Sequence, residues 1–272
     1  MANVKKENGS NAGGMFSGIV IVLCVVVGWI VWKFLMGSGT NFVDGISGGE
    51  PLPGNYLAMV YKGGPIVPIL LGCLLMVIVF SVERFLVISK ASGKGNLDTF
   101  MKNVQANVTS GDIEGAIDTC DKQKGSVANA IKSALLKYQE VKKEGFSSEE
   151  ASETIHKEIE EATSLEMPML EKNMTILSTL VSLGTLAGLL GTVTGMIKAF
   201  GALASTGTPD QSLLANGISE ALINTATGIS TSALAIIAYN FFTSKIDTLT
   251  YSIDEAGSTI VNTYRRFKGS LK

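Results

Sequence analysis

Charged side chains are scarce in this chain. Only 17% of its 272 residues are Asp, Glu, Lys or Arg, whereas soluble domains usually carry about a quarter. The net charge of -2 and the lack of basic clusters interleaved with aromatic residues argue against a nucleic-acid partner. The deficit is concentrated in four uncharged stretches, at residues 15–32, 63–82, 173–197 and 221–244. Each is about as long as a bilayer-crossing helix requires, so the sequence predicts an all-α integral membrane protein with four transmembrane helices and a lipid bilayer around them.

Cysteine and histidine are also rare. Cys24 and Cys73 fall within predicted spans and Cys120 lies in the polar middle of the chain, so their spacing is not that of a disulfide framework. His156, the only histidine, has no cysteine or second histidine to complete a metal site. We therefore expect no metal and no cofactor. Nucleophile-elbow and Walker-type spacings are absent as well, so the sequence gives no support to an enzymatic activity.

The positions of Lys and Arg predict the orientation of the spans. All 22 of these residues except Lys33, Lys62 and Lys198 lie before the first span, between the second and third, or after the fourth. Positive residues favour the cytoplasmic side, so we expect both termini and the long central segment there. The predicted ranges are 1–14 (tail), 15–36 (first span), 37–62 (outer loop), 63–84 (second span), 85–172 (cytoplasmic helical domain), 173–200 (third span), 201–217 (outer loop), 218–244 (fourth span) and 245–272 (cytoplasmic C-terminal helix).

The first span has two interpretations. Lys5 and Lys6 precede it, as basic residues precede the apolar core of a signal peptide. However, the stretch is longer than such a core, ends in the bulky "WIVWKFLM" and lacks an A-x-A-like cleavage site. Retention as a helix is favoured, and the "GSG" at 37–39 leaves cleavage open.

Capping signals predict helices in the polar segment 85–172. Ser147 and Glu150 have the spacing of a capping box, and Asp112 is suited to the N-cap of a shorter helix. The helix that begins at Ser147 is expected to continue toward the third span, with a kink at Pro168. No β-rich soluble domain is expected.

Small and polar residues form a stripe on each of the last two spans. On a helical wheel the stripes consist of Thr185, Gly188, Thr192, Gly195 and Ala199, and of Ala221, Thr225, Gly228, Ser232 and Ala235. Small residues at this spacing are typical of close helix packing, which is the favoured interpretation of the glycines. For Thr192 and Thr225, close packing and a hydroxyl-lined polar path are equally open.

Neither of these two spans contains Asp, Glu, His, Lys or Arg between its ends. An ion path through a bilayer usually needs such a group facing the bundle interior. Glu220 stands at the outer mouth of the fourth span, and Glu83 and Arg84 stand at the inner end of the second, where charged residues often serve as interface anchors. An ion-coupled function therefore requires a partner that supplies a carboxylate.

The segments "GLLGTVTGMIKAF" (188–200) and "ISEALINTATGISTSALAIIAYN" (218–240) together resemble the paired signatures of the MotA/TolQ/ExbB proton-channel family, most closely those of its ExbB members. The resemblance runs from about residue 63 to the C-terminus. It implies a three-span core, preceded here by an extra N-terminal span, in a homo-pentamer of the bacterial inner membrane with periplasmic outer loops. The pore of that pentamer would hold the transmembrane helices of an ExbD-like single-span partner with a membrane carboxylate.

The same resemblance implies roles for individual residues. Thr192 and Thr225 would be the threonines of the proton pathway, and Glu220 the acid at the pore mouth. The pore stripe would consist of Thr185, Gly188, Gly195, Ala221, Gly228 and Ser232. Thr185 and Leu234 stand where the family often has proline, which puts the local helix geometry in doubt.

Several functions remain open. The resemblance implies a proton-motive-force-driven motor that energises a TonB-like protein for outer-membrane nutrient import. A TolQ-like role, or that of a flagellar or gliding stator, is the near alternative. A secondary transporter or a purely structural membrane scaffold would belong to a different class.

Overall fold

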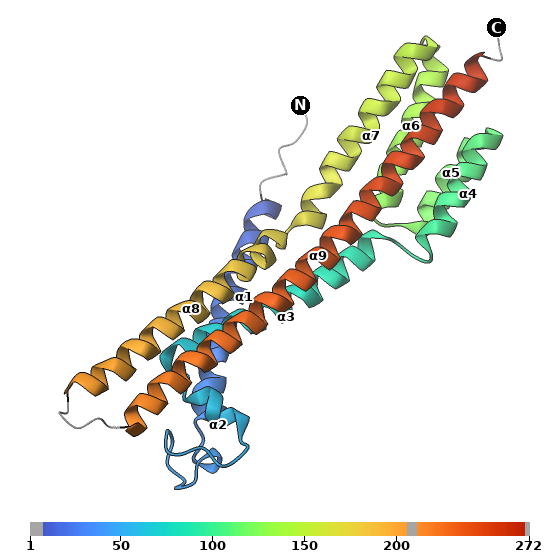
Figure 1. The fold of residues 1–272 in the computed structure, drawn as a ribbon. Helices are drawn as coiled ribbons and strands as arrows, with labels where there is room; N and C mark the ends of the chain where they lie inside the picture. Colours follow the sequence, from blue (N-terminus) through green and yellow to red (C-terminus); the bar gives the residue numbers. More distant parts are fainter. Residues whose placement is uncertain (1–7, 206–210, 270–272) are drawn as a thin grey trace. The chain divides into compact units, whose positions relative to one another are not determined.

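The computed structural model describes residues 8–205 and 211–269, which are predominantly helical (Figure 1). Within these ranges there is no β-strand, only an isolated bridge between Phe42 and Pro51. The helices are α1 (Asn8–Ile30), α2 (Tyr56–Tyr61), α3 (Val67–Ala91), α4 (Leu97–Ser110), α5 (Ile113–Gln123), α6 (Ser126–Glu144), α7 (Ser148–Glu171), α8 (Met174–Ser205) and α9 (Gln211–Gly269). A π-helical turn at Val31–Met36 and 3-10 turns at Gly39–Asn41 and Gly64–Ile66 complete the regular structure. The all-α prediction is confirmed.

Four helical segments are long and apolar enough to cross a membrane. They are Phe16–Met36, Gly64–Ala91, Ser148–Ala204 and Gln211–Lys268, and each overlaps one of the uncharged stretches. The prediction of four spanning helices is therefore confirmed. The ranges assigned to membrane, cytoplasm and outer loops stay predictions.

The chain divides into two compact units. The first comprises Met1–Ser81 and Asn173–Tyr239, and the second Val82–Lys172 and Asn240–Lys272. Helices α3 and α9 pass through a unit boundary without interruption, so each contributes residues to both units.

In the first unit, α1 packs closely on α3. A Cβ added to Gly28 would lie 2.8 Å from Pro68 O and from Gly72 N, so the two backbones touch at this point. Just beyond α1, the Trp32 ring stacks on Tyr61 with 4.8 Å between ring centroids. The extra N-terminal helix is thus an integral part of its unit.

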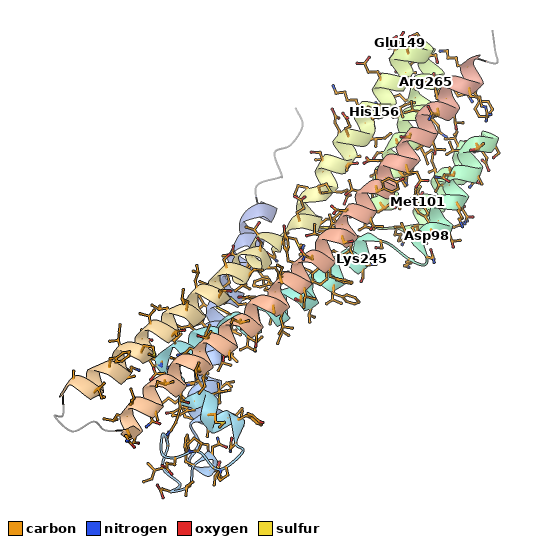
Figure 2. All side chains as sticks on the ribbon, in the orientation of Figure 1. Asp98, Met101, Glu149, His156, Lys245 and Arg265 are labelled. Atoms are coloured by element: carbon orange, nitrogen blue, oxygen red, sulfur yellow. The ribbon has the colours of Figure 1, made fainter. Side chains whose placement is uncertain are left out.

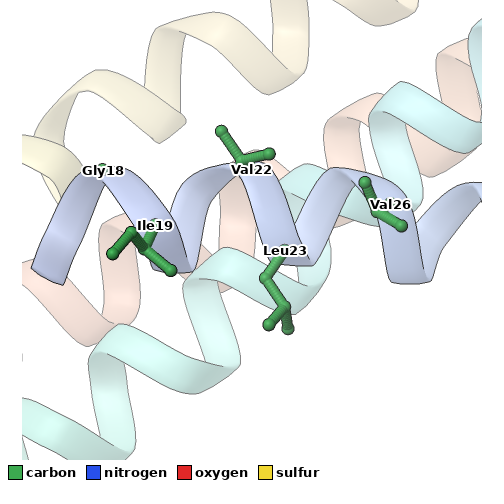
Figure 3. Close-up of a pocket in the computed structure, with 5 residues that line it drawn as sticks. All are labelled: Gly18, Ile19, Val22, Leu23 and Val26. Carbon is green, nitrogen blue, oxygen red and sulfur yellow. The ribbon is translucent and has the colours of Figure 1, made fainter.

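Another face of α1 is apolar and exposed. Around the notch at Gly18 stand four aliphatic side chains, each at least half exposed (Figure 3): Ile19, Val22, Leu23 and Val26. Such a face suits acyl chains, as expected of a spanning helix.

In the second unit, α4 to α7 pack with the C-terminal part of α9. The predicted caps are present, because Asp112 Oδ1 accepts from Gly115 N at 2.9 Å and Ser147 Oγ accepts from Glu150 N at 3.2 Å. Tyr138 of α6 and Tyr264 of α9 meet edge to face in the core, with ring centroids 5.0 Å apart. Beside them, Arg265 donates from Nε to Ser152 Oγ at 3.0 Å, and Figure 2 labels this arginine on α9.

Pro168, at which a kink is expected, lies inside helix α7. Helix α7 continues through Pro168 to Glu171, and the chain breaks about one turn later, at Lys172 and Asn173. Asn173 adopts φ +64°, a left-handed conformation that asparagine tolerates better than most residues. Lys172, with ψ 137°, is also non-helical, so the helical path ends over these two residues.

Helices α8 and α9 extend into the range 201–217 that was expected to be a loop. Helix α8 ends at Ser205 and α9 begins at Gln211, while residues 206–210 lie outside the described part of the chain. The helix breakers Gly207 and Pro209 fall in that interval, and alanine and leucine on either side of it favour helix. The predicted tail 1–14 is helical from Asn8, and residues 1–7 and 270–272 also lie outside the described ranges.

The burial of Cys120 yields a first prediction. This α5 side chain is 2% exposed, and burial raises the pKa of its thiol to about 12, so at pH 8 the thiolate fraction is about one in ten thousand. We expect a maleimide at pH 8 to label Cys120 only after the chain is unfolded, as measured by mass spectrometry of the peptide that contains it. Rapid labelling of the native protein would contradict the described packing of α5.

Candidate functional site

The two small-residue stripes pack against each other within the first unit, where α8 runs beside the first part of α9 (Figure 1). A Cβ on Gly188 would lie 3.1 Å from the Cα of Gly228, and one on Gly195 would lie 2.8 Å from Ala221 N. Gly228 is tighter still, since its Cβ would lie 2.5 Å from Gly184 O. Close helix packing therefore accounts for these glycines. We call this interface the α8–α9 seam.

Paired hydroxyl groups lie along the seam. Thr192 Oγ1 and Thr225 Oγ1 are hydrogen-bonded to each other, and Thr185 Oγ1 donates to Ser232 Oγ at 2.9 Å. On each helix the two members are about two turns apart, so both pairs lie on the same side. We call these four residues the hydroxyl edge. Within the single chain Thr185 is exposed and Thr192 and Thr225 are half-buried, so the edge presents hydroxyl oxygens at the surface of the unit.

The hydroxyl edge can bind a carboxyl group in either protonation state. Thr192 Oγ1 also lies 3.2 Å from Gly188 O, and Thr225 Oγ1 lies 3.1 Å from Ala221 O. Each hydroxyl has one proton, so when one threonine donates across the seam the other donates to its own helix. Lone pairs remain to accept from a carboxylic acid, and rotation of a hydroxyl provides a donor to a carboxylate.

The end of the seam near the C-terminus of α8 carries an ion pair. Lys198 Nζ donates to Glu220 Oε1 at 2.5 Å, and the Glu220 side chain is only 12% exposed. The acid expected at the pore mouth is thus paired within its own chain. The sequence offered no signal for this pairing, because the two residues lie on different helices.

Asn224 is a polar residue of the seam that a search for ionisable groups does not find. It is fully buried, and its Nδ2 donates to Gly63 O at 2.8 Å, which ties α9 to the segment just before α3. Gly191 leaves the space that its side chain occupies. The only sequence signal was an amide in the middle of an apolar span, directly before Thr225.

Two further predictions concern the positions where the family often has proline and the Glu83–Arg84 pair. Thr185 and Leu234 both lie within uninterrupted helices, so neither family proline is needed for the helical path. In the second unit Arg84 is 1% exposed and donates to Glu83 and to the carbonyls of Met169 and Leu170, so it serves to bind the end of α7.

His156 gives no sign of a metal site. It lies on an exposed part of α7 (Figure 2), where its Nε2 is 3.3 Å from Glu160 Oε1. The described residues contain no group of three or more His, Cys, Asp and Glu side chains that could hold a metal.

The tightness of the seam can be tested with one methyl group. Gly228→Ala would force α8 and α9 apart, because the nearest atoms are backbone atoms of α8 that cannot rotate away. We expect it to destabilise the chain by about 1–3 kcal/mol, as overpacking usually does. Gly201→Ala, on α8 with no atom within 4 Å of the new Cβ, is the matched control and should be neutral or stabilising. Thermal unfolding in detergent measures both, and equal melting temperatures would contradict the described seam.

Comparison with known proteins agrees with this architecture. Residues 122–255 match the MotA/TolQ/ExbB proton channel family. An ExbB-like biopolymer transport protein of Synechocystis, ExbB-like 3, is 32% identical over 146 residues, which are 53% of this chain and 70% of that relative. ExbB of Xanthomonas campestris is 31% identical over 40% of this chain, and TolQ of Pseudomonas aeruginosa is 34% identical over 39% of it. The matched region covers 46% of each of these two relatives.

The family match runs from the end of α5 to about three quarters of the way along α9 and so includes the whole seam. The four apolar helices and the relatives named ExbB and TolQ all indicate a multi-pass membrane protein. The chain therefore belongs to the MotA/TolQ/ExbB proton channel family and is a multi-pass protein of the bacterial inner membrane.

Proposed function

We propose that this chain is the ExbB-like subunit of a motor driven by the proton-motive force. In this proposal an ExbD-like single-span partner brings a carboxylate to the hydroxyl edge, and the complex energises a TonB-like protein for nutrient import across the outer membrane. Both termini lie in the cytoplasm. The chain forms and breaks no covalent bonds of a substrate.

The observation that carries the proposal is a polar edge without an ionisable group. Four hydroxyl-bearing residues line one side of the seam at the depth of the uncharged stretches. Ser232 is buried, but Thr185 is exposed and Thr192 and Thr225 are half-buried. Packing alone does not require hydroxyls at these three positions, where aliphatic side chains would face lipid at lower cost. A partner carboxyl group gives these hydroxyls a ligand.

The mechanism follows from the two protonation states of that partner group. A carboxylate on the partner helix accepts hydrogen bonds from the threonine hydroxyls, and its protonated form donates to them. Protonation removes the charge and frees the partner to move past the edge. Each charge that crosses the membrane potential releases about 2.3 kcal/mol per 100 mV, so repeated transfers supply work.

A homo-pentamer places five such edges around one central pore. This arrangement agrees with the surface position of the edge in the single chain, where Thr185 is exposed. It also lets a moving partner meet an equivalent edge at each step of rotation.

A TolQ-like role is the second candidate, because TolQ of Pseudomonas aeruginosa is 34% identical to this chain over the matched region. The seam serves either role equally. A deletion strain distinguishes them, since loss of nutrient uptake supports the ExbB-like role and loss of envelope integrity supports the TolQ-like role.

Removal of two hydroxyl groups tests the channel. The double variant Thr192→Val/Thr225→Val keeps side-chain volume but removes the central pair of the edge. Hydrogen bonds to a charged group contribute about 1.5–3 kcal/mol, so we expect proton-driven uptake to fall roughly tenfold or more while assembly is retained. The measurement is energised uptake in a deletion strain, together with the native mass of the purified variant.

Matched threonines provide the control for this variant. Thr194 and Thr227 lie on the same two helices, and each donates only to a carbonyl of its own helix, Gly191 O and Ile223 O. Thr194→Val/Thr227→Val should therefore leave uptake near the wild-type level. Full uptake by the Thr192/Thr225 variant would favour a structural scaffold.

The oligomeric state is the second test. The detergent-solubilised chain, expressed alone, should have the mass of five 28.6 kDa subunits after subtraction of bound detergent. Native mass spectrometry measures this directly. A monomer or dimer would contradict the ring and direct attention to the transporter and scaffold alternatives.

A further inference from the structure

A polar stripe on α9 faces the segment that precedes α3. Three side chains at successive turns of α9 meet residues 62–64: Asn216, Glu220 and Asn224. Lys62 Nζ donates to Asn216 Oδ1 at 3.3 Å, and Asn224 Nδ2 donates to Gly63 O at 2.8 Å. Between these two contacts lies the carboxylate of Glu220. The start of α3 is therefore bound to α9 over about two turns of the helix.

Glu220 is enclosed from two sides. On one side its Oε1 lies against the bare backbone of Gly64, where a Cβ would overlap the carboxylate. On the other side Lys198 of α8 donates to the same oxygen. Gly64 has φ +78°, so a residue without a side chain is required both by the backbone and by the carboxylate.

The surroundings of the pair are positively charged. Glu220, Lys198 and Lys62 line a cleft of about 300 Å³ at the end of the seam near the C-terminus of α8. Lys62 binds Asn216 there, so Lys198 is the cation in contact with Glu220. Removal of the Glu220 carboxylate would leave the two ammonium groups of Lys198 and Lys62 in the cleft without the anion that contacts Lys198.

We infer that Lys198 is a positioning residue for Glu220, and that this ion pair is an electrostatic latch joining α8, α9 and the start of α3. The latch holds this end of the seam in register and takes no proton in the transport cycle. A proton relay must gain and lose its proton in every cycle. The same event here would release α8 from α9 and the start of α3.

Exchange of the two charges separates a latch from a relay. We expect Lys198→Glu and Glu220→Lys each to lower both the melting temperature in detergent and the energised uptake, because the first places two carboxylates and the second three ammonium groups in the cleft. The double exchange should recover most of both losses. A relay requires a carboxylate at position 220, so an exchanged chain that melts normally but has no uptake would overturn the inference.

The melting temperature tests the latch independently of the proposed function. The uptake assay rests on that proposed function, which the Thr192/Thr225 variant tests separately. If the exchange does not restore the melting temperature relative to the single variants, the latch itself is wrong, whatever the channel does.

Conservative variants keep the test decisive if the exchanged chain does not fold. Lys198→Arg retains the cation and should keep uptake, whereas Lys198→Met should lose it. Equal uptake by these two variants would overturn the role of Lys198.

A pair of glycines provides a test without any change of charge. Gly64 and Gly54 both have φ +78°, so alanine at either position meets the same backbone strain. A new Cβ meets Glu220 at position 64 and nothing within 4 Å at position 54. We expect Gly64→Ala alone to lower uptake and melting temperature beyond the common strain, and equal effects of the two variants would overturn the latch.

Discussion

The backbone contact between α8 and α9 is the constraint on which the rest of the site depends. Where Gly228 meets Gly188, no side chain separates the two helices. Only at this spacing can the short side chains of Thr192 and Thr225 reach each other across the seam. Alanine in place of glycine would move the helices apart and replace the cross-helix hydrogen bond by two isolated hydroxyls, each returned to its own backbone. The close packing of α8 on α9 and the hydrogen bond between the two threonines thus depend on the same glycine contacts.

The high cost of a charge inside a bilayer explains where the charged side chains lie along the chain. A charged side chain at the centre of a bilayer costs about 2.5 kcal/mol or more, and the cost falls toward the interface. In this chain the uncharged stretches carry hydroxyls and the amides of Asn173, Asn224 and Asn240, while ionised groups stand at their ends. Two ion pairs lie at such ends, Lys198 with Glu220 and Arg84 with Glu83. Pairing lets an ion at the edge of an apolar region serve as a structural contact.

Much of the fold follows from local patterns in the sequence, and much of the site does not. Length and polarity predicted four spanning helices, and side-chain chemistry predicted the caps at Asp112 and Ser147, because these signals act within one helix. The Thr192–Thr225 and Lys198–Glu220 contacts join different helices, so they depend on which faces meet and at what register. The break at Asn173 was missed because proline is the stronger breaker in general, yet α7 accommodates Pro168 near its end.

Neutral hydroxyls have an advantage over charged groups as the fixed half of a proton-driven site. A fixed cation would hold a partner carboxylate strongly and release it only after protonation, while a fixed carboxylate would repel the charged form. A hydroxyl binds both the charged and the protonated carboxyl group, because its single proton can reorient. The affinities for the two protonation states therefore differ less, and the partner is not held too tightly in either state. Directionality then has to come from the membrane potential and from geometry. In that arrangement the Lys198–Glu220 ion pair takes no part in the transport cycle, because a proton transferred to Glu220 would break the contact that holds this end of the seam.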